Sequence, residues 1–212
     1  MPSQRLQVIA SMCPDQGGLV DIGSDHGQLP QLLLKRGFSS SLYATELSES
    51  SFQHLKQALI DLPVKVYQAD GLNHMPKGIG TIVMTGMGGQ LIQAILAANE
   101  SQLKNIHTLI LGPHRDQELL RTWLMNHQWI LTDEQFILEG EKGYPILKVS
   151  KGQMQLQVIE LAYGPINIKK RELAFMTWLK LEALEIKKSL QYQDDAHKRR
   201  RLEWIETYVK NG

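Results

Sequence analysis

The sequence predicts an α/β protein, in which helices cover a parallel β-sheet, followed by a separate helical segment. Two observations support this. Short apolar stretches alternate with amphipathic ones through the first two thirds of the 212 residues. After Tyr163-Gly164-Pro165 the composition shifts to Lys, Glu, Leu and Ala, and no Gly or Pro interrupts the chain before its last residue. That shift is typical of long helices.

The first predicted unit is a strand at 18–22, a loop, and a helix at 28–36 that ends at Gly37, where left-handed backbone suits glycine. The same alternation then predicts strands at 41–46, 64–68, 80–85 and 107–111, with helices at 50–60, 90–99 and 115–127. Polar turns separate three further segments, which predict a closing group of antiparallel strands at 129–138, 144–150 and 154–161.

The last part of the chain predicts a helical hairpin. Apolar residues spaced three and four apart form one seam, at Met176, Leu179, Ala183, Ile186 and Leu190. A second seam, at Leu202, Ile205 and Val209, supplies the partner helix, with a turn near Asp194-Asp195. Trp178 and Trp204 lie in these amphipathic helices, so we expect them to pack in the core. We therefore divide the chain into domains at 1–164 and 165–212.

Composition excludes several classes of protein. No stretch approaches 18 consecutive apolar residues, so no membrane-spanning helix is expected. The N-terminus lacks the apolar run of a signal peptide, and the single cysteine, Cys13, cannot form an internal disulfide. These features favour a cytoplasmic protein. The seven histidines and Cys13 show no spacing typical of a zinc site, so we expect no metal.

Charge is distributed unevenly along the chain. Residues 1–150 hold 11 Lys and Arg against 14 Asp and Glu, whereas residues 151–212 hold 12 against 8. Basic clusters at 169–171 and 198–201 are candidate contacts for nucleic-acid phosphates. The alternative is that these clusters are ordinary solvated helix surface.

Acids and glycines follow the predicted strands at the points where the strands end. In a parallel sheet these carboxyl ends meet at one edge, where ligands bind near the switch in strand order. An alternative is that Gly23 and Gly27 only form a tight turn between strand and helix. The residues that we assign to cofactor binding are Asp21, Gly23, Glu46, Asp70, Gly71, Gly86, Met87 and Gly88.

The types of these residues indicate the chemistry of the cofactor. A carboxylate at the end of the second strand holds a ribose diol well, and we assign this role to Glu46. Asp70 is placed to accept a hydrogen bond from an adenine amino group. The first loop lacks the G-x-G-x-x-G pattern that binds pyrophosphate, and its acids, Asp21 and Asp25, would repel phosphate. S-adenosylmethionine fits better, because it carries an ammonium, a sulfonium and no phosphate.

Several strings resemble those of a known family, the bacterial tRNA (adenine(22)-N(1))-methyltransferases, or TrmK family. They are DIGSDHGQLP at 21–30, ADGL at 69–72, TGMGGQLI at 85–92 and RTWL at 121–124. GYPI and YGP farther along also match, so the resemblance covers nearly the whole chain. The sequence departs from the family pattern where it reads ILGPH, ending at His114, in place of a segment like ILQPN.

The resemblance implies a Rossmann-like class I methyltransferase domain followed by a helical, coiled-coil-like domain. It also implies methyl transfer from S-adenosylmethionine to ring nitrogen 1 of an adenosine in tRNA, at position 22. We expect tRNA as the partner, with no membrane and no obligate protein partner. Two alternatives remain open: a methyltransferase for a small molecule, and a non-catalytic RNA-binding module that retains the fold.

Asp25 is our candidate catalytic residue. Nitrogen 1 of adenine has an in-plane lone pair, so no general base is obligatory, but a carboxylate would stabilise the charge that develops on the ring. The alternative is that Asp25 caps the helix that begins near Gly27. For substrate binding we assign His26 and Arg115 near the site. In the C-terminal segment we add the basic cluster Lys169, Lys170 and Arg171. We also assign Arg121, a further arginine close to the site.

Overall fold

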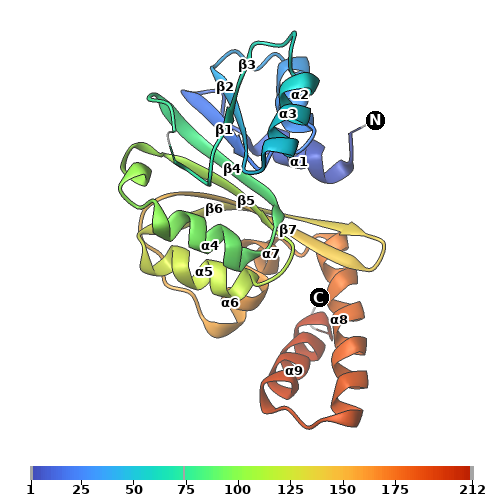
Figure 1. The fold of residues 1–212 in the computed structure, drawn as a ribbon. Helices are drawn as coiled ribbons and strands as arrows, with labels where there is room; N and C mark the ends of the chain where they lie inside the picture. Colours follow the sequence, from blue (N-terminus) through green and yellow to red (C-terminus); the bar gives the residue numbers. More distant parts are fainter. Residues whose placement is uncertain (1, 74, 211–212) are drawn as a thin grey trace.

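The computed structural model describes residues 2–73 and 75–210, and its centre is one seven-stranded sheet (Figure 1). The strand order is β3-β2-β1-β4-β5-β7-β6. Strands β1 to β5 run parallel, and β7 pairs antiparallel with both β5 and β6. The strands are β1 (Gly18–Ile22), β2 (Leu42–Glu46), β3 (Val64–Gln68), β4 (Ile79–Met87), β5 (Thr108–Pro113), β6 (Trp129–Glu139) and β7 (Lys142–Lys151).

Helices cover both faces of the sheet, as Figure 1 shows. On one face lie α1 (Gln4–Met12) and α2 (Gln28–Lys35), which pack on the apolar cluster around Ile9, Leu29 and Val83. Helix α3 (Glu49–Ala58) lies beside β2 and β3. The other face carries the larger cluster, which includes Ile92 and Leu120. It is covered by α4 (Gly89–Ala98) and α5 (Gln117–Asn126), with a short 3-10 helix at Gln102–Asn105. Both faces of β1 are therefore buried, as the apolar strand pattern predicts.

Most predicted elements are confirmed within one or two residues, and Gly37 has the expected left-handed backbone, with φ of 82°. One strand prediction is wrong: 154–161 forms no strand, and α6 (Val158–Tyr163) begins inside it. The alternation of apolar residues with glutamine there is misleading. The Glu160 carboxylate accepts a hydrogen bond from the Gln157 backbone N–H at 2.8 Å, which starts a helix instead.

Helix α1 was not among the elements predicted from the sequence. This helix begins at Ser3, whose hydroxyl oxygen accepts a hydrogen bond from the Leu6 backbone N–H at 3.2 Å. Its residues Ile9, Ala10 and Met12 are buried in the apolar cluster between this helix and the sheet. A serine cap followed by a recurring apolar face is a recognisable helix signal, so this element was predictable.

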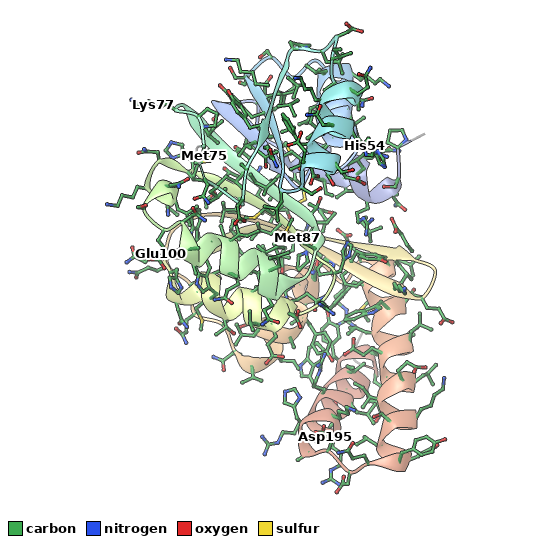
Figure 2. All side chains as sticks on the ribbon, in the orientation of Figure 1. His54, Met75, Lys77, Met87, Glu100 and Asp195 are labelled. Carbon is green, nitrogen blue, oxygen red and sulfur yellow. The ribbon has the colours of Figure 1, made fainter. Side chains whose placement is uncertain are left out.

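The predicted C-terminal hairpin is confirmed. After α7 (Pro165–Lys170), helices α8 (Leu173–Tyr192) and α9 (Ala196–Lys210) pack together and project from the sheet, and Figure 2 labels Asp195 at the far end of the pair. Its core contains Leu179, Ala183 and Ile205, as the seams predict, and it continues into β6 through Phe136. Trp178 and Trp204 pack against this core. The domain boundary and the coiled-coil character remain predictions.

A buried ion pair joins the hairpin's root to the sheet, and it corrects the prediction that Arg121 contacts RNA. The side chains of Arg121 and Glu134 are 1% and 0% exposed, with Arg121 Nη2 2.9 Å from Glu134 Oε1. Arg121 Nη1 donates to the carbonyl of Leu161 in α6, and Glu134 Oε2 accepts from the backbone N–H of Ile166 in α7. Arg121 is therefore structural.

Among the helices of residues 2–73 and 75–210, none combines the length and the hydropathy that a membrane span requires.

Candidate active site

The strand order switches between β1 and β4, and the predicted site residues gather at the carboxyl edge of the sheet on both sides of that switch. Figure 2 labels Met87 at the end of β4, in the middle of this edge. The loop after β1 lies against the tip of β2, because Gly23 and Ser24 donate backbone hydrogen bonds to the Thr45 carbonyl at 3.0 and 3.1 Å. The Ala69 N–H donates to the Glu46 carbonyl at 2.9 Å, which holds the β3 tip in line.

The Glu46 side chain links the tip of β2 to the loop after β1, which contains Asp25. Its Oε1 atom accepts a hydrogen bond from the Asp25 backbone N–H at 2.5 Å. Its Oε2 atom has no hydrogen-bond partner among residues 2–73 and 75–210, so it can accept from a bound ligand. The Asp25 backbone is left-handed, with φ of 53°, a conformation that aspartate tolerates better than most residues.

The Asp25 side chain does not cap helix α2, which was the alternative to its catalytic role. Helix α2 has Gly27 as its N-cap and no side-chain cap. The side chain of Asp25 is exposed, and its Oδ1 atom lies 3.6 Å from Nε2 of His26. The geometry thus argues against the capping alternative and leaves this carboxylate available to a ligand.

Asp21 is a buried acid, only 4% exposed. Burial, with a smaller contribution from the nearby Glu46 carboxylate, raises its pKa to about 6 against the opposing effect of the Ser24 hydroxyl, which donates a hydrogen bond at 2.6 Å. A cation bound beside Asp21 would favour its ionised form. This site is therefore suited to a positively charged ligand.

The predicted glycines have different roles. Gly23 and Gly86 have positive φ, and a Cβ at Gly86 would meet nothing within 4 Å. Gly86 thus keeps its loop surface open, while a Cβ at Gly23 would lie 3.2 Å from Cε of Met87. In contrast, a Cβ at Gly71 would lie 2.9 Å from the Ile95 side chain, and one at Gly88 would lie 3.2 Å from Nε of Arg115. Gly27 is also a packing position, since a Cβ there would collide with Leu59.

Two hollows open at this edge. One is a small cavity beside Tyr67, Gly71 and Thr45, and the buried Thr45 hydroxyl has no hydrogen-bond partner among the described residues. Asp70 follows β3 directly beside it and is exposed. The other hollow, of about 190 Å³, is lined by the loop after β1 from Asp21 to His26, by Thr85 and Gly86, and by residues of α1 that include Arg5. Arg5 is a candidate functional residue that the sequence analysis missed together with its helix.

The structure brings only some of the predicted substrate-binding residues to this edge. His26 belongs to the loop after β1, and Arg115 lies against Gly88 at the β4 tip with its side chain 82% exposed. Lys169, Lys170 and Arg171 lie instead at α7, which packs on the edge strand β6.

Two members of that basic cluster are engaged within the protein. Lys170 Nζ lies 2.7 Å from an Asp133 oxygen, and Arg171 donates to the Tyr208 carbonyl at 2.9 Å and stacks on its ring. Lys169 is exposed and forms no ion pair in the described part of the chain. No group of three or more His, Cys, Asp or Glu side chains is arranged to hold a metal ion in residues 2–73 and 75–210.

Comparison with known proteins supports one family. The family model for tRNA (adenine(22)-N(1))-methyltransferases, TrmK, matches residues 19–210. A relative with that description from Bacillus subtilis is 34% identical over 171 residues, which cover 78% of this chain and 70% of the relative.

Solved structures agree over the full length. A Streptococcus pneumoniae protein in complex with S-adenosyl-L-methionine has a TM-score of 0.91 and 30% identity, covering 99% of this chain and 100% of that one. The crystal structure of the Bacillus subtilis m1A22 tRNA methyltransferase TrmK has a TM-score of 0.82 and 26% identity, covering 100% and 98%. The resemblance indicated by the sequence motifs is confirmed, and the chain belongs to the tRNA (adenine(22)-N(1))-methyltransferase family, TrmK.

Proposed function

We propose that this protein transfers a methyl group from S-adenosylmethionine to ring nitrogen 1 of the adenosine at position 22 of tRNA, and that it acts in the cytoplasm. The observation that carries the cofactor assignment is the set of acids at the carboxyl edge. Asp21, Asp25 and Glu46 lie at adjacent strand tips, and no Lys or Arg of residues 2–73 and 75–210 forms an ion pair with any of them. Such a site favours a cationic ligand over a phosphate.

The residues present fit an adenosyl donor. Glu46 Oε2 is available to accept from a ribose hydroxyl, and Asp70 at the next tip is placed for the adenine amino group. Asp21 would face the ammonium of the methionyl part in the hollow that Gly23 and Gly86 also line. When bound, S-adenosylmethionine supplies an electrophilic methyl group on a sulfonium.

The remaining task of the protein is to position the nucleophile. Orientation of the adenine lone pair in line with the methyl group accounts for about 7 to 11 kcal/mol of such a barrier. Positive charge develops on the adenine ring during transfer, and the exposed carboxylate of Asp25 would stabilise it more than the starting state. Asp25 would also accept a hydrogen bond from the 6-amino group, which orients the ring.

The C-terminal hairpin is our candidate for holding the tRNA. Helix α8 has 20 residues and is therefore about 30 Å long, and its first turns pack on β6. Lys169 on α7, at the root of the hairpin, and Arg200 on α9 are exposed and form no ion pair within the described residues, which leaves them available to phosphates. These contacts would offset the few kcal/mol needed to extrude the target base from folded RNA.

The function is tested by two linked measurements. Calorimetry with S-adenosylmethionine tests donor binding, and incubation with unmodified tRNA followed by mass spectrometry of the digested nucleosides tests for 1-methyladenosine. A tRNA with guanosine at position 22 serves as the matched control and should remain unmodified. Donor binding without any methylated nucleoside would favour a non-catalytic module, and methylation of small molecules alone would favour the other alternative.

A further inference from the structure

Helix α1 has no role in the function proposed above, yet it forms one wall of the hollow at the carboxyl edge. The opposite wall is the acidic loop after β1. From α1, Arg5 adds a guanidinium to this hollow. Within the described residues, no carboxylate lies within 4.0 Å of this guanidinium, so no ion pair neutralises its charge.

Two aromatic side chains hold the guanidinium in place. Arg5 Cζ lies 4.5 Å from the centre of the Tyr144 ring, in a cation–π contact. Arg5 Nη1 lies 3.4 Å from Nε2 of His114. The His114 ring packs edge-on against Tyr144 with centroids 5.5 Å apart. These contacts hold the guanidinium against the Tyr144 ring and leave the N–H groups that do not face His114 for an anion.

His114 is itself held at the site. Its backbone N–H donates to the Met87 carbonyl at 3.0 Å, which ties the end of β5 to the β4 tip. Burial lowers the pKa of His114, and the neighbouring Arg5 charge lowers it further, against a weaker opposite effect of Glu139. The imidazole is therefore neutral near pH 7, and the positive charge of this cluster resides on Arg5.

The position of the cluster along the sheet indicates what it binds. His114 follows β5 and Tyr144 lies on β7, which are two and three strands from β1 in the sheet. Arg5 therefore meets its aromatic partners on the β4–β5–β7 side of the β1 tip, in the hollow that the loop after β1 also lines. Glu46 and Asp70 lie on the other side of β1. Since Glu46 and Asp70 are assigned to the adenosyl group, the side of β1 on which Arg5 lies is the one left for the second substrate, whose anions are phosphates.

We propose that Arg5, oriented by Tyr144 and His114, binds a backbone phosphate of the tRNA strand beside the adenosine that enters the site. This inference rests on the proposed function, since it requires that RNA is the substrate. Arg5 is then a substrate-binding residue, and Tyr144 is a positioning residue that acts through it. The contact places one fixed positive charge at an otherwise acidic entrance, which sets the register of the strand without reading its sequence.

The test compares the full-length Arg5→Gln and Arg5→Lys variants with Arg36→Gln, which removes an exposed arginine at the end of α2. Binding of unmodified tRNA is measured by fluorescence anisotropy between 50 and 200 mM salt, and binding of S-adenosylmethionine by calorimetry. Thermal unfolding checks that each variant is folded. For Arg5→Gln we expect tRNA affinity to fall roughly tenfold, as for loss of one charge-assisted hydrogen-bonded pair. The slope of log K against log salt should fall by about 0.7 to 0.9, and donor affinity should stay within about twofold.

The lysine and tyrosine variants separate a specific contact from a structural effect. Arg5→Lys keeps the charge, so the salt slope should be retained while the affinity falls only in part. Tyr144→Phe keeps the ring beneath the guanidinium and should bind tRNA like the wild type, whereas Tyr144→Leu should lose roughly threefold.

Two results would overturn the inference. One is tRNA binding by Arg5→Gln equal to that of Arg36→Gln, with the same salt slope. The other is a large loss of donor affinity with tRNA affinity retained, which would assign Arg5 to the carboxylate of the donor. Failure of the proposed function is a separate result, because it would appear as absence of 1-methyladenosine with the wild-type protein.

Discussion

Replacing Arg121 by leucine tests the buried ion pair that joins the catalytic sheet to the root of the hairpin. In the wild type, Glu134 Oε1 accepts from Arg121 Nε at 3.0 Å, and the two side chains are 1% and 0% exposed. Leucine leaves the Glu134 carboxylate without a cation and leaves the Leu161 carbonyl without its donor. Removing one partner of a buried pair costs about 3 to 5 kcal/mol of unfolding free energy. For a chain of this size, that corresponds to a decrease in Tm of about 6 to 20 °C.

The assay is urea unfolding followed by circular dichroism, with Arg115→Leu as the control. Arg115 is 82% exposed, so its loss should change stability by no more than about 0.5 kcal/mol. The double variant Arg121→Leu/Glu134→Gln should recover about 1 to 3 kcal/mol, because a neutral amide replaces the unpaired carboxylate and still accepts from the Ile166 N–H. A loss below 1 kcal/mol for Arg121→Leu, or no recovery in the double variant, would refute this reasoning.

Four further predictions concern the acids of the site and the basic surface of the C-terminal segment. Asp25→Asn should lower the single-turnover methylation rate at least tenfold with unchanged donor affinity, and a wild-type rate in quenched-flow measurements would remove Asp25 from the mechanism. Because the pKa of Asp21 is raised to about 6 in the folded state, the folded protein holds a proton that the unfolded chain releases, so the free energy of unfolding should decrease as the pH rises from about 4 to 6. In urea titrations this pH dependence should be present in the wild type and absent in Asp21→Asn. Because ionised Asp21 attracts a cation, the affinity for S-adenosylmethionine measured by calorimetry should increase as the pH rises through 6. An affinity that does not change with pH would contradict the cation site. Reversing the exposed charges, in Lys169→Glu/Arg200→Glu, should weaken tRNA binding and reduce its salt dependence in anisotropy titrations without changing donor affinity; unaltered tRNA binding would exclude this surface.

The alternation of strands and helices was predictable because each element carries its own local signal. Buried strands such as Gly18–Ile22 are continuously apolar apart from Asp21, and glycines mark the turns. The positions of the acids followed from the same reading, since any parallel sheet brings its carboxyl ends to one edge. Thus Asp21, Asp25 and Glu46 could be grouped from sequence although they are up to 25 residues apart.

What sequence could not supply were pairings between distant side chains. Arg121 was expected to contact RNA because the sequence places it near the site. Its burial depends on Glu134, which reaches it from another element. Likewise, Lys170 and Arg171 belong to a basic run whose charges are engaged by Asp133 and by Tyr208. The role of α1 was missed for the same reason, since Arg5 acquires its neighbours only when β5 and β7 end beside it.

The most direct test of the account is a calorimetric comparison of S-adenosylmethionine with NAD on the wild-type protein, repeated with Glu46→Gln. We predict binding of S-adenosylmethionine, weakened about tenfold or more in Glu46→Gln because an acceptor of the ribose diol is lost, and no measurable binding of NAD. Tight binding of NAD together with no heat from S-adenosylmethionine would show that the acids at the sheet edge do not select a cationic adenosyl donor.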